Sequence, residues 1–209
     1  KGNDETAVKA LNAGASSYVP KSMLEDRLLD SVESLLSIAR HARGEPHTLG
    51  CPLGSQFSID NDAAKIPASI SRIRQILRQA NLYDEATEIR TCVALEEALT
   101  NAMFHGNLDL DSRLREGDRQ TFRVLVEERR SVDPYRHRRI HVSVSVEADR
   151  GAIVIRDEGQ GFDATNLPDP TDPANLERLS GRGLLLMRTF MDEVRYNDIG
   201  NEVTLIKRK

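Results

Sequence analysis

The stretch at residues 140–162 reads IHVSVSVEADRGAIVIRDEGQGF, and it gives the clearest indication of the fold. Apolar and polar residues alternate strictly over 140–146, which is the period of a half-buried strand. A second strand is expected over 152–156. It leads directly into the D-x-G-x-G motif at 157–161. The two glycines of this motif permit a tight turn and a close approach of the backbone to a ligand.

Helical and strand patterns continue on both sides of this stretch. Apolar residues recur at helical spacing over 66–82, and Asp84 is a candidate N-cap for a helix that runs to about residue 105. The same patterns predict helices over 118–130 and 184–191, strands over 55–60 and 202–207, and a loop over 162–180. We therefore expect an α/β domain over residues 55–209.

The first 43 residues form a separate pattern. A helix is expected over 6–11, a short strand over 17–19 and an amphipathic helix over 24–40, a unit too small to fold alone. The segment that follows is rich in glycine and proline, which indicates a linker. The expected organisation is an N-terminal segment, a linker and a domain, at 1–43, 44–54 and 55–209.

Composition excludes several classes of protein. The chain has 209 residues, of which 39% are hydrophobic and 30% charged, enough to bury a core. Its net charge is 29 − 33 = −4, and only 4% of residues are aromatic, so direct nucleic-acid binding is not expected. No apolar run approaches the length of a membrane span. Cys51 and Cys92 lack metal or disulfide spacing, so we expect free thiols in a reducing cytoplasm.

The helix expected up to residue 105 contains the sequence LEEALTNAMFHGN at 95–107. Glu97 and Asn101 are four residues apart, so both project from one helix face, among apolar neighbours. A carboxamide oxygen is a hard ligand suited to Mg²⁺, and a carboxylate can orient or deprotonate a nucleophile. The alternative is that both side chains are simply solvated, as Glu and Asn on a helix usually are.

Two glycine-containing segments are further candidates for ligand binding. Asp157 follows a strand, where its carboxylate can accept a hydrogen bond from an exocyclic amine such as that of adenine. The alternative is that D-x-G-x-G forms only an ordinary turn. A calcium loop is disfavoured, because the repeated acidic residues of an EF-hand are missing. The sequence SGRGL at 180–184 opens a helix, where backbone N–H groups can face an anion. An ordinary helix cap is the alternative there.

The order of these segments resembles the GHKL ATPase superfamily over about residues 55–209. The segments EEALTNAMFHGN, RDEGQGFD, GRGLLLMRTFMDEVRY and GNEVTLIKRK together are similar to the serine kinases that act as anti-sigma factors in bacterial partner switching. The resemblance implies a GHKL, or Bergerat-type, ATP-binding fold, an α+β sandwich with a mixed sheet and helices on one face. It also implies that ATP and Mg²⁺ bind.

The resemblance assigns roles to residues that match the family motifs. Glu97 would be the general base for the target serine, and Asn101 would hold Mg²⁺ with the ATP phosphates. Asp157 would recognise the adenine amino group, while Gly159 and Gly161 would shape the adenine side of the pocket.

The later motifs extend this assignment to the phosphates and the last strand. Gly181 and Gly183 would let the backbone approach the phosphates, and Arg182 would add charge there unless it is exposed in a lid. Thr204 would contact adenine through water, although threonine is also simply a good strand former.

A second resemblance covers about 40 residues at the start of the chain. The sequence AVKALNAGASSYVPKSMLEDRLLDSV is similar to the C-terminal end of a response-regulator receiver domain, with Lys21 in the place of the lysine that follows its last strand. Ser22 stands where that family usually has proline. A solvated loop lysine is the alternative reading. Because only the end of the domain matches, we expect the chain to be part of a longer protein.

Together these features predict a receiver-coupled serine/threonine protein kinase of the anti-sigma-factor type in the cytoplasm. The expected partners are an anti-sigma-factor antagonist and a sigma factor, with no nucleic acid or membrane, and homodimer formation stays open. One alternative is a nucleotide-dependent binding module, which the intact Glu97 disfavours. The other is a histidine-kinase-like ATPase, which the lack of an acidic-flanked histidine on a dimerisation helix disfavours.

The segment 108–138 is longer than the corresponding link in compact family members. This part of the chain is rich in arginine, with Arg129, Arg130, Arg136, Arg138 and Arg139. A solvated face is one interpretation of this charge run, and a docking surface for an acidic partner is the other.

Overall fold

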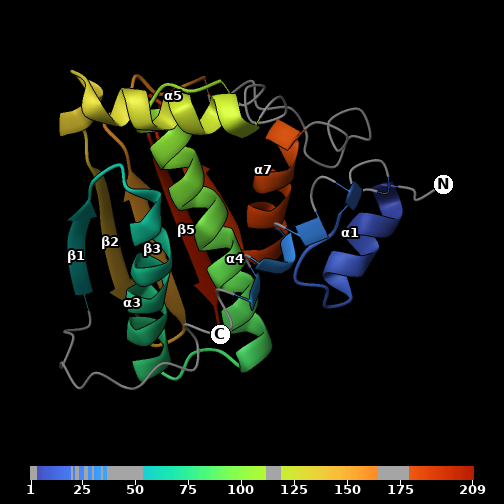
Figure 1. Cartoon of the computed structure of the whole chain (residues 1–209). Coiled ribbons are helices and arrows are strands. Elements are labelled where there is room, and N and C mark those ends of the chain that lie inside the picture. Colours follow the sequence, from blue (N-terminus) through green and yellow to red (C-terminus); the bar gives the residue numbers. More distant parts are fainter. Residues whose placement is uncertain are drawn as a thin grey trace.

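A five-stranded antiparallel sheet forms the back of the molecule in this computed structural model (Figure 1). The structure describes residues 4–19, 54–111, 119–163 and 179–209, together with 21, 24, 25, 28, 29, 31–33, 35 and 36. The strand order is β1-β2-β3-β5-β4. The strands are β1 (Gly54–Ile59), β2 (Ile140–Val146), β3 (Arg150–Arg156), β4 (Glu193–Tyr196) and β5 (Glu202–Arg208).

Alternation in the sequence decides which face of the sheet is buried. Ile140, Val142 and Val144 of β2 are buried, whereas His141 and Ser145, on the other face of the strand, are exposed. The strand expected from this pattern is therefore confirmed. The expected mixed sheet is wrong, because every strand pairing among the described residues is antiparallel. The short links between β2 and β3 and between β4 and β5 can only reverse the chain direction.

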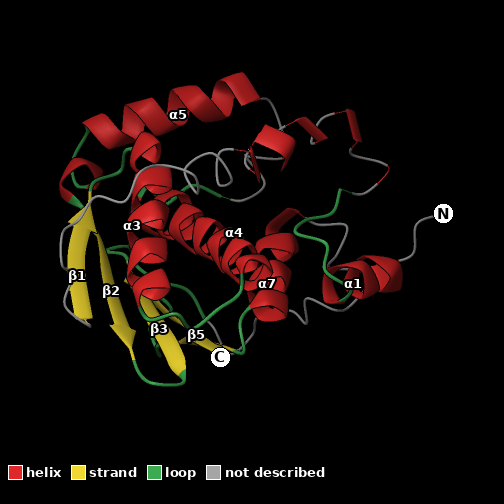
Figure 2. Cartoon of the chain, turned by 90° about the horizontal axis from the view of Figure 1, so that it is seen from below, coloured by secondary structure: helices red, strands yellow, loops and turns green. Residues whose placement is uncertain are grey.

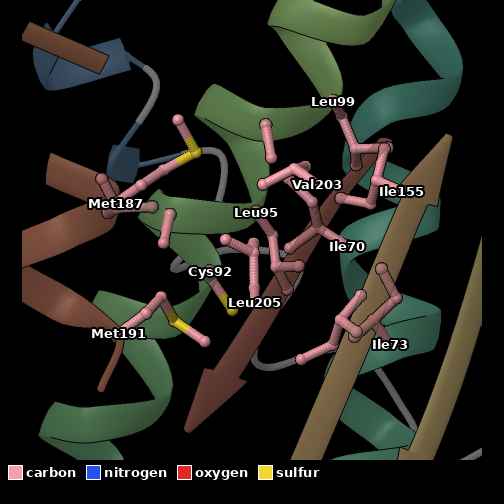
Figure 3. Packing of buried hydrophobic residues seen from close by; sticks show 14 of the residues in the cluster. Ile70, Ile73, Cys92, Leu95, Leu99, Ile155, Met187, Met191, Val203 and Leu205 are labelled. Carbon is pink, nitrogen blue, oxygen red and sulfur yellow. The ribbon is translucent and has the colours of Figure 1, made fainter. Parts of the chain in front are cut away.

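Three helices cover one face of the sheet, as the view from below shows (Figure 2). They are α3 (Ile66–Gln79), α4 (Glu85–Asn101) and α7 (Leu179–Phe190). Apolar side chains from all three helices and from β3 and β5 meet in one core (Figure 3). Ile73 and Leu95 are 0% exposed there, and the stripe predicted along 66–82 faces this core.

Helix α4 begins where the sequence predicts. The Asp84 side chain accepts a hydrogen bond of 2.8 Å from the Thr87 N–H, which caps the first turn. A buried ion pair then ties α4 to α3, because Glu88 lies 3.0 Å from Arg74 and 3.2 Å from Arg78. The helix ends at Asn101 and continues as a π-helix over Ala102–Asn107. Such π-helical turns are rare and frequently occur at functional sites.

Helix α5 (Arg119–Ser131) confirms the helix expected over 118–130 and lies across the ends of α3 and α4 (Figure 1). Its apolar stripe packs on Leu108 and Leu110, with the ring centroids of Phe122 and Phe104 5.3 Å apart. The segment 108–138 therefore adds a small second core at this end of the domain.

Two elements differ from the sequence-based expectation. Helix α7 begins at Leu179, five residues before the expected start, so Gly181 and Gly183 lie inside it. Its close packing on α4 outweighs the low helix propensity of glycine. Strand β4 was not expected, because Val194 and Tyr196 are its only inward-facing apolar residues. Two positions are too few to define a period.

The N-terminal helix α1 (Asp4–Asn12) packs beside α7 (Figure 1). Leu11 is 1% exposed and belongs to the same core as the helices of the domain. Helix α1 and its end near Gly14, at φ +117°, match the expectation. The strand expected over 17–19 is wrong, because these residues join no sheet.

The rest of the N-terminal prediction is tested only in part. The described residues between 24 and 36 are helical, but Leu28, Val32 and Leu36 of the expected apolar stripe are 42–47% exposed. The expected linker lies outside the described residues except for Gly54, which begins β1, and so does most of the loop over 162–180. Among the residues described, no helix is both long and apolar enough to cross a membrane.

The buried position of Leu11 yields a stability prediction. Leu11→Ala is expected to lower the free energy of unfolding of the whole domain by about 2–4 kcal/mol, because it leaves a cavity in the shared core. Leu28→Ala, at a position 47% exposed, is the matched control and is expected to change it by about 0.5 kcal/mol or less. Urea denaturation of both variants measures this. Equal stabilities of the two variants would show that α1 is not part of the folding unit.

Candidate functional site

The predicted site residues gather at the end of α4, where it meets α7 and the end of β3. Glu97 and Asn101 lie on the side of α4 that faces α7. A Cβ added to Gly183 would stand 2.7 Å from Glu97 Oε2 and 3.7 Å from Asn101 Nδ2. The absence of a side chain at Gly183 therefore leaves room for both polar groups. Two motifs more than 80 residues apart in the sequence thus meet here.

The Asp157 carboxyl group is buried at the other end of this region. It is 7% exposed, and its Oδ1 accepts a hydrogen bond of 2.8 Å from the Gly159 N–H. Burial raises the pKa of Asp157 to about 6, and the Gly159 hydrogen bond only partly opposes this rise. A buried carboxyl group with a raised pKa is typical of a ligand-recognition or catalytic position.

Gly106 of the π-helix lies directly against Asp157. A Cβ at Gly106 would stand 2.3 Å from the carboxyl carbon of Asp157, and one at Gly159 would stand 2.2 Å from the Gly106 oxygen. A side chain at Gly106 would displace the Asp157 carboxyl group, and one at Gly159 would require the backbone of Gly106 to move. The end of α4 and the D-x-G-x-G turn are therefore packed backbone against backbone.

A second pair of glycines fixes the far side of the turn. Gly161 has φ +74°, and a Cβ there would stand 2.1 Å from the Ile199 oxygen. Gly200 in the β4–β5 turn has φ +81°, and a Cβ there would stand 2.0 Å from the Phe162 oxygen. The D-x-G-x-G turn is thus held between the π-helix and the β4–β5 turn.

Two asparagines that the sequence analysis left without a role complete this region. Asn107 is 0% exposed and Asn61 is 5% exposed. The Asn107 amide accepts a hydrogen bond of 2.8 Å from the Glu158 N–H and donates one of 2.8 Å to Asn61 Oδ1. The sequence placed Asn107 in a candidate motif, but nothing in its pattern showed that the side chain is buried.

Not every predicted site residue joins this group. Val203 and Leu205 of β5 are buried under the helices, so Thr204 between them points to the opposite face of the sheet. The structure therefore does not bring Thr204 together with Asp157. The backbone of Gly181 and Arg182 lies in the first turn of α7, while their side-chain environment falls outside what the structure describes.

His105 has a structural partner. Its Nδ1 lies 2.6 Å from the Leu110 oxygen. Because a carbonyl oxygen only accepts hydrogen bonds, Nδ1 carries the proton. This contact ties the π-helical end of α4 to the segment that follows it.

In the described part of the arginine-rich segment, each of the five arginines named above has a partner. Arg129 donates to the backbone oxygens of Leu108 and Asp109. Arg138 lies 3.1 Å from the Asp109 carboxylate and donates to the Asn107 oxygen at 2.8 Å. The other three arginines pair with carboxylates, Arg130 with Glu127 and Asp62, Arg136 with Asp133 and Arg139 with Asp60. These contacts favour a structural role over a docking surface for this segment.

Comparisons with known proteins cover the part of the chain that carries these residues. A family model described as a histidine kinase-like ATPase domain matches residues 59–207. The chain is 32% identical over 127 residues to an anti-sigma F factor of Anoxybacillus flavithermus, covering 59% of this chain and 68% of that protein. It is 33% identical over 138 residues to one of Bacillus cereus, covering 65% and 74%. The N-terminal receiver-like segment lies outside the family match and stays a prediction.

The raised pKa of Asp157 yields a pH-dependent stability prediction. Because this pKa rises from about 3.8 to about 6 on folding, the folded state binds more protons between these values, and wild-type stability falls as pH rises through them. Asp157→Asn removes this loss, so the variant is expected to be more stable than wild type at pH 7.5 by about 1–2 kcal/mol. Near pH 4 the two proteins are expected to be equally stable.

Urea denaturation across this pH range measures the difference. Glu158→Gln is the matched control, because hydrogen bonds to His141 lower the pKa of the neighbouring Glu158 and its shift has the opposite sign. This variant is expected to gain no stability at pH 7.5. A pH-independent difference between wild type and Asp157→Asn would contradict the assignment of the raised pKa.

Proposed function

The chain belongs to the histidine kinase-like ATPase domain family, and from this membership we propose that it is an ATP-dependent serine/threonine protein kinase. ATP would lie along α4, with its adenine at Asp157 and its phosphates beside Asn101 and Gly183. The observation that carries the proposal is the close approach of Gly183 to both Glu97 and Asn101. It brings a candidate base, a candidate magnesium ligand and a helix backbone into one small region.

The adenine end is supported by the chemistry of a buried acceptor. The Asp157 carboxylate can accept a hydrogen bond from an exocyclic amino group. Burial makes the unpaired charge costly, and such a hydrogen bond offsets part of that cost.

The phosphate end is supported by Asn101 and the small residues of α7. The Asn101 carboxamide oxygen would hold Mg²⁺, which would neutralise phosphate charge during transfer. A glycine at position 183 keeps the space beside Asn101 open. Phosphoryl transfer depends mainly on such positioning and charge neutralisation.

Glu97 would orient and deprotonate the acceptor hydroxyl group. The proton of the serine or threonine hydroxyl passes to the Glu97 carboxylate as the hydroxyl oxygen bonds to the γ-phosphorus of ATP. The bond between this phosphorus and the β,γ-bridging oxygen breaks, and ADP leaves. Glu97 is partly exposed, so a protein substrate can reach it.

The relatives suggest the class of partner. Proteins named anti-sigma F factors are similar to the chain over more than half of its length. We therefore expect an antagonist protein as the phosphate acceptor and a sigma factor as a bound partner. Control by a receiver domain is part of the same proposal, and the packing of α1 on α7 is a contact through which such control could reach the site.

Phosphate transfer tests the proposal directly. Wild type with γ-labelled Mg-ATP is expected to label a small protein in a lysate of the source cells with an acid-stable phosphate. Glu97→Gln is expected to reduce labelling by about 100-fold or more while ATP affinity changes by about twofold or less, because a general base contributes 10²–10⁴-fold.

One variant serves as a control for nucleotide binding, and two other results would contradict the proposal. Asp157→Asn is expected to weaken ATP binding itself. If ATP binds but nothing is labelled when a purified antagonist is supplied, the chain is a nucleotide-dependent binding module. An acid-labile label would point to histidine phosphorylation instead.

The approach of Gly183 to Glu97 gives a second prediction. Gly183→Ala places a methyl group 2.7 Å from Glu97 Oε2, so the carboxylate must move. Labelling is expected to fall about tenfold or more, since displacement of a catalytic group by about 1 Å is costly. Gly54→Ala is the control, because its nearest neighbour would be 3.8 Å away. Unchanged labelling by Gly183→Ala would contradict the proposal that the observed position of the Glu97 carboxylate is needed for transfer.

A further inference from the structure

The buried amides of Asn107 and Asn61 form a hydrogen-bonded chain with one possible direction. At one end the Glu158 N–H donates to Asn107 Oδ1 at 2.8 Å, and a backbone N–H can only donate. At the other end Asn61 Nδ2 donates to the Tyr135 oxygen at 2.8 Å, and a backbone carbonyl can only accept. The link between them, Asn107 Nδ2 to Asn61 Oδ1, is therefore fixed in orientation.

This chain joins four segments around the turn that carries Asp157. Glu158 lies in the turn, Asn107 ends the π-helix, Asn61 follows β1 and Tyr135 lies in the connection from α5 to β2. The Tyr135 ring is itself in contact with Arg129 and Arg138, whose guanidinium carbons lie 5.1 and 5.0 Å from the ring centroid. The residue that accepts the last hydrogen bond of the chain is thus held by two further contacts.

Asn107 also sits next to the closest backbone contact of the site. Gly106, its neighbour, has space for no side chain because the Asp157 carboxyl group lies against it. A change at Asn107 therefore acts on Asp157 by two routes, through the Glu158 N–H and through Gly106. A fully buried amide whose oxygen and nitrogen are both hydrogen-bonded has little freedom to change its orientation.

We propose that Asn107, supported by Asn61, is a positioning residue that sets the preference of the site for adenine over other purines. The inference rests on the proposed recognition of adenine by Asp157. Asparagine is required at both positions, because each side chain must accept on one side and donate on the other. Aspartate lacks the donor and leucine lacks both groups.

The test compares ATP with inosine triphosphate, which carries a carbonyl oxygen in place of the adenine amino group. Wild type is expected to bind ATP at least about tenfold more tightly, since the carboxylate of Asp157 has no hydrogen to accept from that oxygen. Asn107→Leu is expected to reduce this preference by about tenfold, with inosine triphosphate affinity changed by about twofold or less. Calorimetric titration of the full chain measures both affinities.

Two further variants separate positioning from loss of stability. Asn61→Leu leaves the Glu158 hydrogen bond in place and is expected to reduce the preference by about threefold, which keeps the test decisive if Asn107→Leu does not fold. Tyr83→Phe removes hydrogen bonds to Gly151 and Lys207 at the opposite end of β3, and its preference is expected to equal that of wild type.

The contrary outcomes are distinguishable. An equal loss of affinity for both nucleotides, or no loss of preference in either asparagine variant, overturns the inference. Asp157→Asn is expected to abolish the preference. If it does so while the asparagine variants do not, only the inference fails. If Asp157→Asn retains the preference, the proposed recognition of adenine fails as well.

Discussion

The packing of α4 between the sheet and α7 is the constraint on which the rest of the structure depends. One side of this helix is closed by core residues such as Leu95 and Leu99, which are 0% exposed. Burial on that side fixes the rotation of the helix, so Glu97 and Asn101 must turn toward α7. The π-helical end then carries Gly106 to Asp157. A single rigid element thus sets the distance between the two ends of the candidate nucleotide site, because a helix advances about 1.5 Å per residue.

At the proposed adenine end of the site, buried polar groups are matched with hydrogen-bond partners. Asp157 is almost fully enclosed, and its raised pKa reflects the cost of holding a charge there. The backbone N–H groups of Glu158 and Gly159 are satisfied by Asn107 and by Asp157 itself. This leaves the carboxyl group as the acceptor with capacity for a ligand. The arginines of the segment 108–138 serve the same region, since Arg129 and Arg138 bind backbone oxygens around Asp109 and hold the Tyr135 ring.

Strong local signals allowed correct prediction of most elements. The strict alternation of 140–146 and the Asp84 cap were confirmed, because each depends on neighbours within one element. The expected start of α7 is too late, since the glycines at 181 and 183 lower helix propensity and the contact of Gly183 with α4 is remote in sequence. The mixed sheet that the family resemblance implied is wrong. The strand patterns could not correct it, because strand direction is a property of pairing rather than of any single strand. The short strand β4 offered too few residues for a period.

The sequence by itself determined the motifs, their order and the chemical types of the candidate site residues. The family match over 59–207 agrees with that reading. Tertiary structure alone decided which of these residues meet. It placed Gly183 against Glu97, turned Thr204 to the opposite face and buried Asn107 between Glu158 and Asn61. The physical reason is that residue type and spacing describe one element at a time. Contacts between elements arise from the burial of their apolar faces, which no single segment contains.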